Sequence, residues 1–127
     1  MSSRLSAASV FAVALLLTAC PPEVKVSVYN NTPDPITLVW LRGQSMVVPS
    51  HSSSTLSLPP VLTTFSTIRQ GVKHDYAIHY PGKELMYPSY RFGLQIQPNA
   101  KIYAVKGRLP ASGFPSQPSG YPLVPHP

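Results

Sequence analysis

The sequence predicts an all-β domain, a small antiparallel β-sandwich that follows a short apolar leader. After residue 23 the apolar residues recur at every second position, which is the period of a strand with one buried face. Turn-forming residues interrupt this pattern at intervals of roughly ten residues, which is typical of sandwiches and small barrels. The 16 prolines in 127 residues also disfavour long helices.

Strand prediction follows the alternation from one turn to the next. Residues 24–29 form the clearest case, with three valines on one face, and the turn chemistry of residues 30–35 ends them. Residues 36–41 are apolar on both faces, which predicts a central strand covered on both sides. The last two strands, separated by residues 97–100, are expected to form a hairpin. The full set of expected strands is 24–29, 36–41, 45–48, 55–58, 64–69, 75–80, 90–96 and 101–106.

The type of sandwich stays open between an immunoglobulin-like and a transthyretin-like arrangement. The chain has a single cysteine, so the cysteine pair of an antibody-type domain is absent and no intrachain disulfide is possible. The predicted sandwich spans residues 23–109, and its stability must come from its hydrophobic core.

The first 19 residues have the organisation of a secretory signal helix. One basic residue, Arg4, precedes an uncharged stretch over residues 7–17, which is shorter than the roughly 20 residues that cross a bilayer. The stretch ends in Leu17, Thr18 and Ala19, followed by Cys20. This tetrapeptide resembles the lipobox of bacterial lipoproteins, in which the cysteine carries the lipid.

The resemblance implies that the signal over residues 1–19 is removed and that Cys20 is acylated, with residues 20–22 as anchor and linker. Several acyl chains on one residue give a stable membrane anchor. In such lipoproteins an aspartate after the cysteine retains the protein at the inner membrane. This chain has Pro21 there, which favours the outer membrane, with the inner membrane as the alternative. The periplasmic side is expected rather than the cell surface. A plain secretory signal that leaves Cys20 as a free thiol is the competing interpretation.

Charge and composition argue against several classes of partner and site but do not identify a ligand. From Cys20 onward the chain has nine Lys or Arg residues against four acids. Nucleic acid is not expected for an exported protein, so anionic membrane, lipopolysaccharide or cell-wall polymer are the nearer partners. No cofactor or metal site is predicted, because the four histidines are scattered and nucleophile and phosphate-loop motifs are absent. The acids Asp34, Asp75 and Glu84 are interpreted as solvated turn or strand-end residues.

Two segments are candidate interaction sites. The first is a surface of Lys83, Tyr87, Tyr90 and Arg91, where aromatic rings alternate with cations, as in sites for sugars or anionic polymers. Tyr76, Tyr80 and Phe92 are assigned to the core instead.

The second is the proline-rich segment over residues 110–127, predicted to be a disordered, extended tail. It repeats an aromatic residue followed by a Pro-x-x-Pro spacing, a pattern that docks into aromatic grooves. The residues of this motif are Phe114, Pro115, Pro118, Tyr121, Pro122 and Pro125.

The leading functional hypothesis is a non-enzymatic envelope lipoprotein that binds or assembles with another envelope component. The alternative is a binder of anionic cell-wall polymer or lipopolysaccharide through the Lys/Arg and Tyr surface. An enzyme is the third and least favoured class, with His74 and Asp75 as the residues to test.

Overall fold

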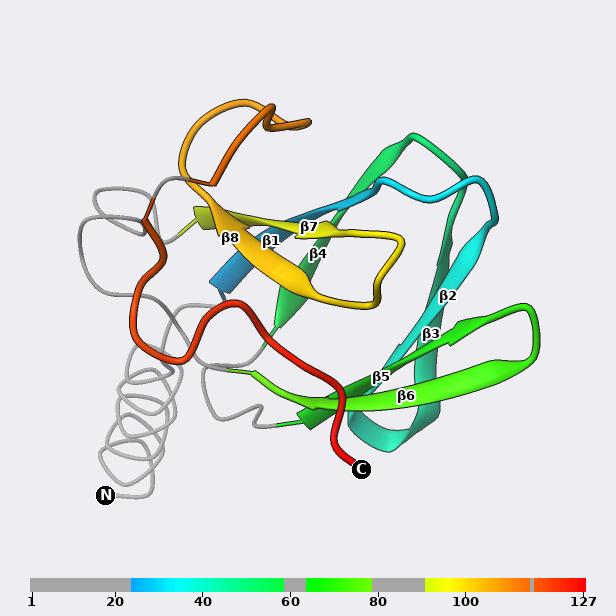
Figure 1. Ribbon diagram of the computed structural model, residues 1–127. Coiled ribbons are helices and arrows are strands. Elements are labelled where there is room, and N and C mark those ends of the chain that lie inside the picture. The colour runs from blue at the N-terminus through cyan, green and yellow to red at the C-terminus, as the bar shows by residue number, and fades with distance from the viewer. Residues whose placement is uncertain (1–23, 59–63, 79–90, 115) are drawn as a thin grey trace, which may run out of the picture.

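Eight strands form two four-stranded sheets that pack face to face, in a computed structural model that describes residues 24–58, 64–78, 91–114 and 116–127 (Figure 1). Sheet A has the order β4-β1-β7-β8 and sheet B the order β3-β2-β5-β6. The predicted β-sandwich is therefore confirmed. The strands are β1 (Val24–Asn30), β2 (Ile36–Trp40), β3 (Gln44–Val48), β4 (Ser53–Leu58), β5 (Thr64–Arg69), β6 (Val72–Ala77), β7 (Arg91–Ile96) and β8 (Ile102–Val105).

The strand order selects between the two sandwich types. β1 lies between β4 and β7 and runs parallel to β7, whereas every other pairing is antiparallel. An immunoglobulin constant-type sheet joins its first and second strands, which here belong to different sheets. The order therefore departs from the immunoglobulin type and leaves the transthyretin-like alternative.

Alternation places the core between the sheets. In β1 the three valines are buried, while Lys25 is exposed and Ser27 and Tyr29 are partly exposed. Tyr76 and Phe92 are buried, as expected from the sequence, whereas Tyr80 lies outside the described residues. The buried apolar residues of the strands are Val24, Val26, Val28, Ile36, Leu38, Val48, Leu56, Leu58, Tyr76, Phe92, Leu94, Ile96, Ile102, Ala104 and Val105.

Two expectations about single strands need correction. β6 begins at Val72 instead of residue 75, because Gln70 and Gly71 have positive φ and close a two-residue hairpin that pairs Arg69 with Val72. β2 is internal in its sheet, as predicted, but it is not covered on both faces. Thr37 and Val39 on its outer side stay partly exposed, since no element packs over them among the described residues.

The sandwich has two distinct ends. At one end the odd-numbered strands begin and the even-numbered strands stop, and we call this the entry end. The opposite end, the turn end, holds the short connections 31–35, 49–52, 70–71 and 97–101. A fully buried Asn30 organises it: the amide nitrogen donates to the carbonyls of Asp34 (2.8 Å) and Val48 (3.0 Å).

The segment after residue 109 is not the disordered tail that its composition predicts. Tyr121 and Leu123 are only 8% and 3% exposed and join the core. Leu123 forms a β-bridge with Ile102 of β8, and the backbone N–H of His126 donates to the carbonyl of Asp75 in β6 at 2.8 Å. Figure 1 shows this segment, coloured red, running from sheet A across to β6. Burial of these two side chains and the backbone hydrogen bonds to β8 and β6 both contribute to offsetting the conformational entropy lost when the segment is ordered.

Candidate functional site

Most residues of the predicted cation and tyrosine surface cannot be placed. Lys83, Tyr87 and Tyr90 lie outside the described residues, as do the signal motif Leu17, Thr18 and Ala19, and the lipid-bearing Cys20. Arg91 is the exception at the level of the backbone, because it begins β7 and pairs in register with Lys25 of β1. Arg91 therefore lies beside the start of β1.

The structure describes most of the tail motif, and both of its aromatic side chains pack against the domain. The ring of Phe114 stacks on Tyr103 of β8, with centroids 4.2 Å apart, and Tyr121 is buried. The carbonyl of Pro118 accepts a hydrogen bond from the backbone of Tyr121 at 3.1 Å. Pro122 and Pro125 are partly exposed, while Pro115 lies outside the described residues. The sequence pattern predicted that these aromatic side chains would dock into a partner's groove. In this structure they pack against the domain itself instead.

The residues after β8 cover the outer face of sheet A. Leu109 lies over Gly93 so closely that a Cβ at position 93 would be 3.3 Å from its Cδ1. Next along the chain, the backbone N–H of Ala111 donates to the side chain of Gln95 at 2.8 Å, and Gln95 is 1% exposed although it points away from the core. Glycine at 93 thus permits an approach that a side chain would obstruct.

The same segment then closes the edge of β8. Gln117 uses its side-chain amide as a strand would use its backbone, accepting from the N–H of Ala104 (2.8 Å) and donating to its carbonyl (2.9 Å). The bridge between Ile102 and Leu123 continues this pairing. An uncovered edge strand is a template for unwanted pairing, so the tail shields the β8 side of the sandwich.

The outer face of sheet B has no such cover among the described parts of the chain. Cross-strand pairing places Val47, Thr37 and Ile68 in one row and Ser45, Val39 and Ser66 in the next. Val47 is 57% exposed, and the remaining members are exposed or partly exposed. The only charges in these two rows, Lys73 and Asp75, lie on the edge strand β6 and face each other at 3.9 Å. This face, named here the sheet B face, is uncharged across three strands and rich in β-branched residues.

The described acids have partners of their own. Asp34 accepts from the Arg69 side chain at 3.0 Å and from Gln70 at 3.1 Å, and Asp75 accepts from Ser66. Across the described ranges no three His, Cys, Asp or Glu side chains come together as metal ligands do. His74 and Asp75 are neighbours on β6, so their side chains point to opposite faces.

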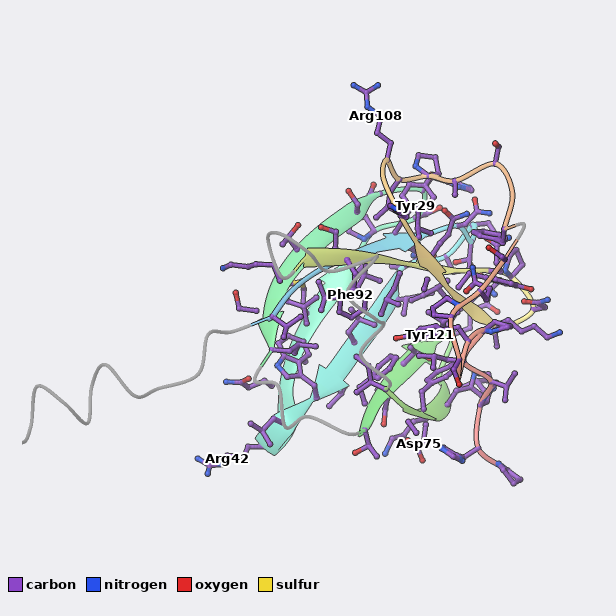
Figure 2. All side chains as sticks on the ribbon, turned by 90° about the vertical axis from the view of Figure 1, so that its left-hand side faces the viewer. Tyr29, Arg42, Asp75, Phe92, Arg108 and Tyr121 are labelled. Atoms are coloured by element: carbon purple, nitrogen blue, oxygen red, sulfur yellow. The ribbon has the colours of Figure 1, made fainter. Side chains whose placement is uncertain are left out.

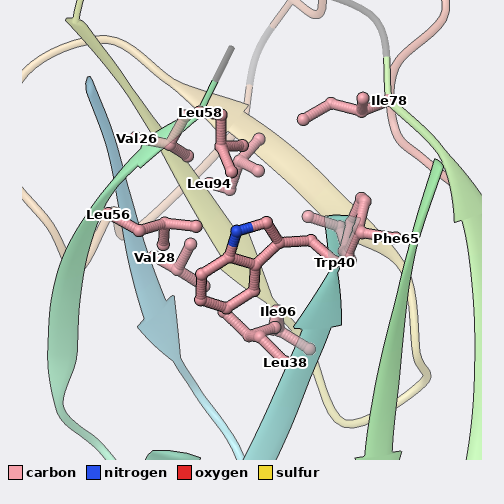
Figure 3. Close-up of a pocket in the computed structure, with 11 residues that line it drawn as sticks. Val26, Val28, Leu38, Trp40, Leu56, Leu58, Phe65, Ile78, Leu94 and Ile96 are labelled. Atoms are coloured by element: carbon pink, nitrogen blue, oxygen red, sulfur yellow. The ribbon is translucent and has the colours of Figure 1, made fainter. Parts of the chain in front are cut away.

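An apolar cavity of about 20 Å³ lies between the two sheets (Figure 3). It is lined from sheet A by residues such as Val26 and Leu58, and from sheet B by Trp40, Phe65 and Ile78. This volume would hold about one water molecule, and no polar group lines it to bind one. A small-molecule site needs roughly 300 Å³ or more, so the cavity is a packing defect of the core.

Tyr76 is a buried tyrosine whose pKa is raised above its ordinary value. Its ring is fully buried and stacks on Phe65 at a centroid distance of 5.2 Å, while its hydroxyl donates to the carbonyl of Ala100 at 2.7 Å. Burial raises the pKa of the phenol above its ordinary value, and the hydroxyl of Thr67 offsets part of this rise. The hydroxyl links β6 to the turn after β7, which is a structural role.

Comparisons with known protein families, with curated proteins and with solved structures found no match for this chain. No helix within the described ranges is long and apolar enough to cross a membrane. The sheet B face was not among the surfaces expected from the sequence. Alternation identified its residues as outward-facing, but whether another segment covers them depends on the sheet order and on the path of the tail.

Proposed function

We propose that this protein is a non-enzymatic lipoprotein of the bacterial envelope. Acyl chains on Cys20 anchor it, on the periplasmic side of the outer membrane, and the sandwich binds or assembles with another envelope protein. The observation that carries the assembly role is the contrast between the two outer faces. The chain's own tail covers sheet A over Gly93 and Gln95, whereas no described segment covers the sheet B face, where Val47 is exposed.

The physical character of the sheet B face suits a protein partner. Desolvating charged groups costs free energy, and β2, β3 and β5 present no charge on this face. The exposed aliphatic groups of Val47 and the half-buried Val39 and Ile68 supply apolar area, while serine and threonine hydroxyls can form hydrogen bonds at the margin.

The anchor is supported by the lipobox and by the short distance to the fold. β1 starts at Val24, so only residues 21–23 separate it from Cys20. Growth with labelled palmitate tests this part: the wild type should incorporate label and partition into detergent, and Cys20→Ser should do neither. Equal behaviour of the two proteins would refute the anchor.

The assembly role is tested by in-cell cross-linking from a photoreactive residue at position 45, in the sheet B face, with Val47→Asp as the disrupting variant. Position 27 in the outer face of sheet A is the matched control site. A discrete adduct from position 45 that disappears in Val47→Asp, with the fold retained, is the expected result. Absence of an adduct, or an equal adduct from position 27, would contradict the proposal.

The second candidate, a binder of anionic cell-wall polymer or lipopolysaccharide, depends on the cations near Arg91. It predicts salt-sensitive retention of the Cys20→Ser protein on isolated envelopes. Retention that does not change with salt would count against it.

A further inference from the structure

We propose that the entry end of the sandwich is a second membrane contact, whose cations bind the anionic headgroups of the phospholipid bilayer. This inference rests on the proposed anchor at Cys20, which would hold that end of the domain against the membrane. The fold gathers lysine and arginine residues at this end.

Cations meet at the entry end of sheet A because of the strand directions. β1 and β7 are parallel, so Lys25 near the start of β1 pairs with Arg91 at the start of β7. β8 is antiparallel to β7, so Lys106 and Arg108 follow its last residue at the same end. Neighbouring strands are about 4.8 Å apart, so Lys25, Arg91 and the end of β8 span about 10 Å.

The rest of the domain is nearly neutral. Arg69 is paired with Asp34 at 3.0 Å and Lys73 with Asp75 at 3.9 Å, which leaves Lys101 as the remaining cation of the turn end. Lys25, Arg42, Lys106 and Arg108 form no salt bridge with an acid among the described residues. Among the described residues, this end holds five cations and no acid, against three cations and two acids elsewhere. The five are Lys25, Arg42, Arg91, Lys106 and Arg108. The net positive charge of the described residues is therefore carried mainly by the entry ends of the two sheets.

Arg42 adds a charge at the tip of the β2–β3 turn, which belongs to the same end of sheet B. Its backbone has φ 56°, a left-handed conformation that asparagine or glycine adopts at lower cost than arginine. The charge is thus not a requirement of the turn. Figure 2 shows the side chains of Arg42 and Arg108 extending away from opposite sides of the domain, while Phe92 and Tyr121 point into it. The two sheets therefore carry their entry-end cations at separate places on the surface.

The anchor brings these cations within range of the membrane. Lys25 is five residues from Cys20, a reach of at most about 17 Å for an extended chain. Surface potential extends over a Debye length of about 8 Å at physiological salt, so part of the entry end lies in the field of anionic lipid. Like charges on adjacent strands repel one another, and a layer of phosphates would relieve that repulsion. Each cation near such a surface strengthens binding about fivefold.

The test uses residues 20–127 with Cys20→Ser, which contain every described residue but carry no lipid. Binding is measured by co-sedimentation with vesicles of phosphatidylcholine alone and with vesicles rich in phosphatidylglycerol. The double variant Lys106→Gln/Arg108→Gln removes two charges at the entry end, and Lys73→Gln/Lys101→Gln removes two charges elsewhere. Arg42→Asn removes one charge and is expected to keep or raise stability.

We expect binding only to the anionic vesicles, weakened about fivefold for each charge removed at the entry end and less than twofold by the control double variant. Equal weakening by both double variants would show an effect of net charge alone and overturn the proposal. Binding to lipopolysaccharide but not to phosphatidylglycerol would overturn it in favour of the polymer hypothesis. Because the protein tested has no lipid, failure here is distinct from failure of palmitate labelling, which tests the anchor.

Discussion

Leu123 and Ile102 form an antiparallel bridge in which each backbone N–H donates to the other residue's carbonyl, at 2.7 Å and 3.0 Å. Ile102 belongs to the edge strand β8, and Leu123 belongs to a proline-rich segment with little hydrophobic periodicity. The bridge gives β8 a partner on its free side and places Leu123 in the core. The segment after residue 109 is thus a structural part of the sandwich.

Leu123→Ala should lower the free energy of unfolding by about 2–5 kcal/mol, because it removes a buried leucine and leaves a cavity. Val124 is 55% exposed, so Val124→Ala is the matched control and should change stability by less than about 0.5 kcal/mol. Urea denaturation followed by tryptophan fluorescence measures both. Equal, near-zero effects would mean that the tail is not packed on the core.

Gln117→Ala should destabilise the fold by about 1–3 kcal/mol, since it leaves both backbone groups of Ala104 without their side-chain partners. The local signature is faster hydrogen exchange at the amide of Ala104. Ser116→Ala, at an exposed neighbouring position, is the control and should leave that exchange rate unchanged.

Asn30→Asp should cost about 3 kcal/mol or more at neutral pH. Asn30 is fully buried, and its amide nitrogen donates to two carbonyls, while its oxygen accepts from the N–H and the hydroxyl of Thr32. A carboxylate cannot donate, and it would carry an unpaired charge in a buried site. The loss should shrink as the pH is lowered and the new acid becomes protonated, and a thermal melt series from pH 7 to pH 4 would reveal it. A loss that does not vary with pH would argue against burial of the charge.

Tyr76→Phe should change how stability depends on alkaline pH. The folded pKa of Tyr76 is raised, so the unfolded chain loses this proton first, and its stabilising contribution is lost as the pH rises above about 10. The variant lacks the hydrogen bond to Ala100 and should be less stable by about 1 kcal/mol at pH 7. Its stability should then fall less steeply than that of the wild type above pH 10. Parallel curves for the two proteins would show that Tyr76 is not the group responsible.

Much of the fold follows from local pattern. The alternating valines of β1 and the turns at 30–35 and 97–100 are visible in the sequence because side-chain period and turn chemistry are local properties. The same reasoning identified Tyr76 and Phe92 as core residues. The interaction sites were harder to predict, because exposure depends on what covers a residue. Val47 and Gln95 both point outward from their sheets, yet one is exposed and the other is buried beneath the tail.

The sequence by itself determined the strand periodicity and the sandwich class, because side-chain alternation and turn chemistry are local properties of the chain. It also supplied the resemblance of residues 17–20 to a lipobox, which stays a prediction. Only the tertiary structure decided the parallel pairing of Lys25 with Arg91 and the docking of Tyr121 and Leu123. Those contacts join residues that are far apart in the chain, and their free energy comes from burial against a core that exists only once both sheets have formed. The proline-rich composition of residues 110–127 indicates a low propensity for helix and strand. It does not indicate that Tyr121 and Leu123 pack into the hydrophobic core.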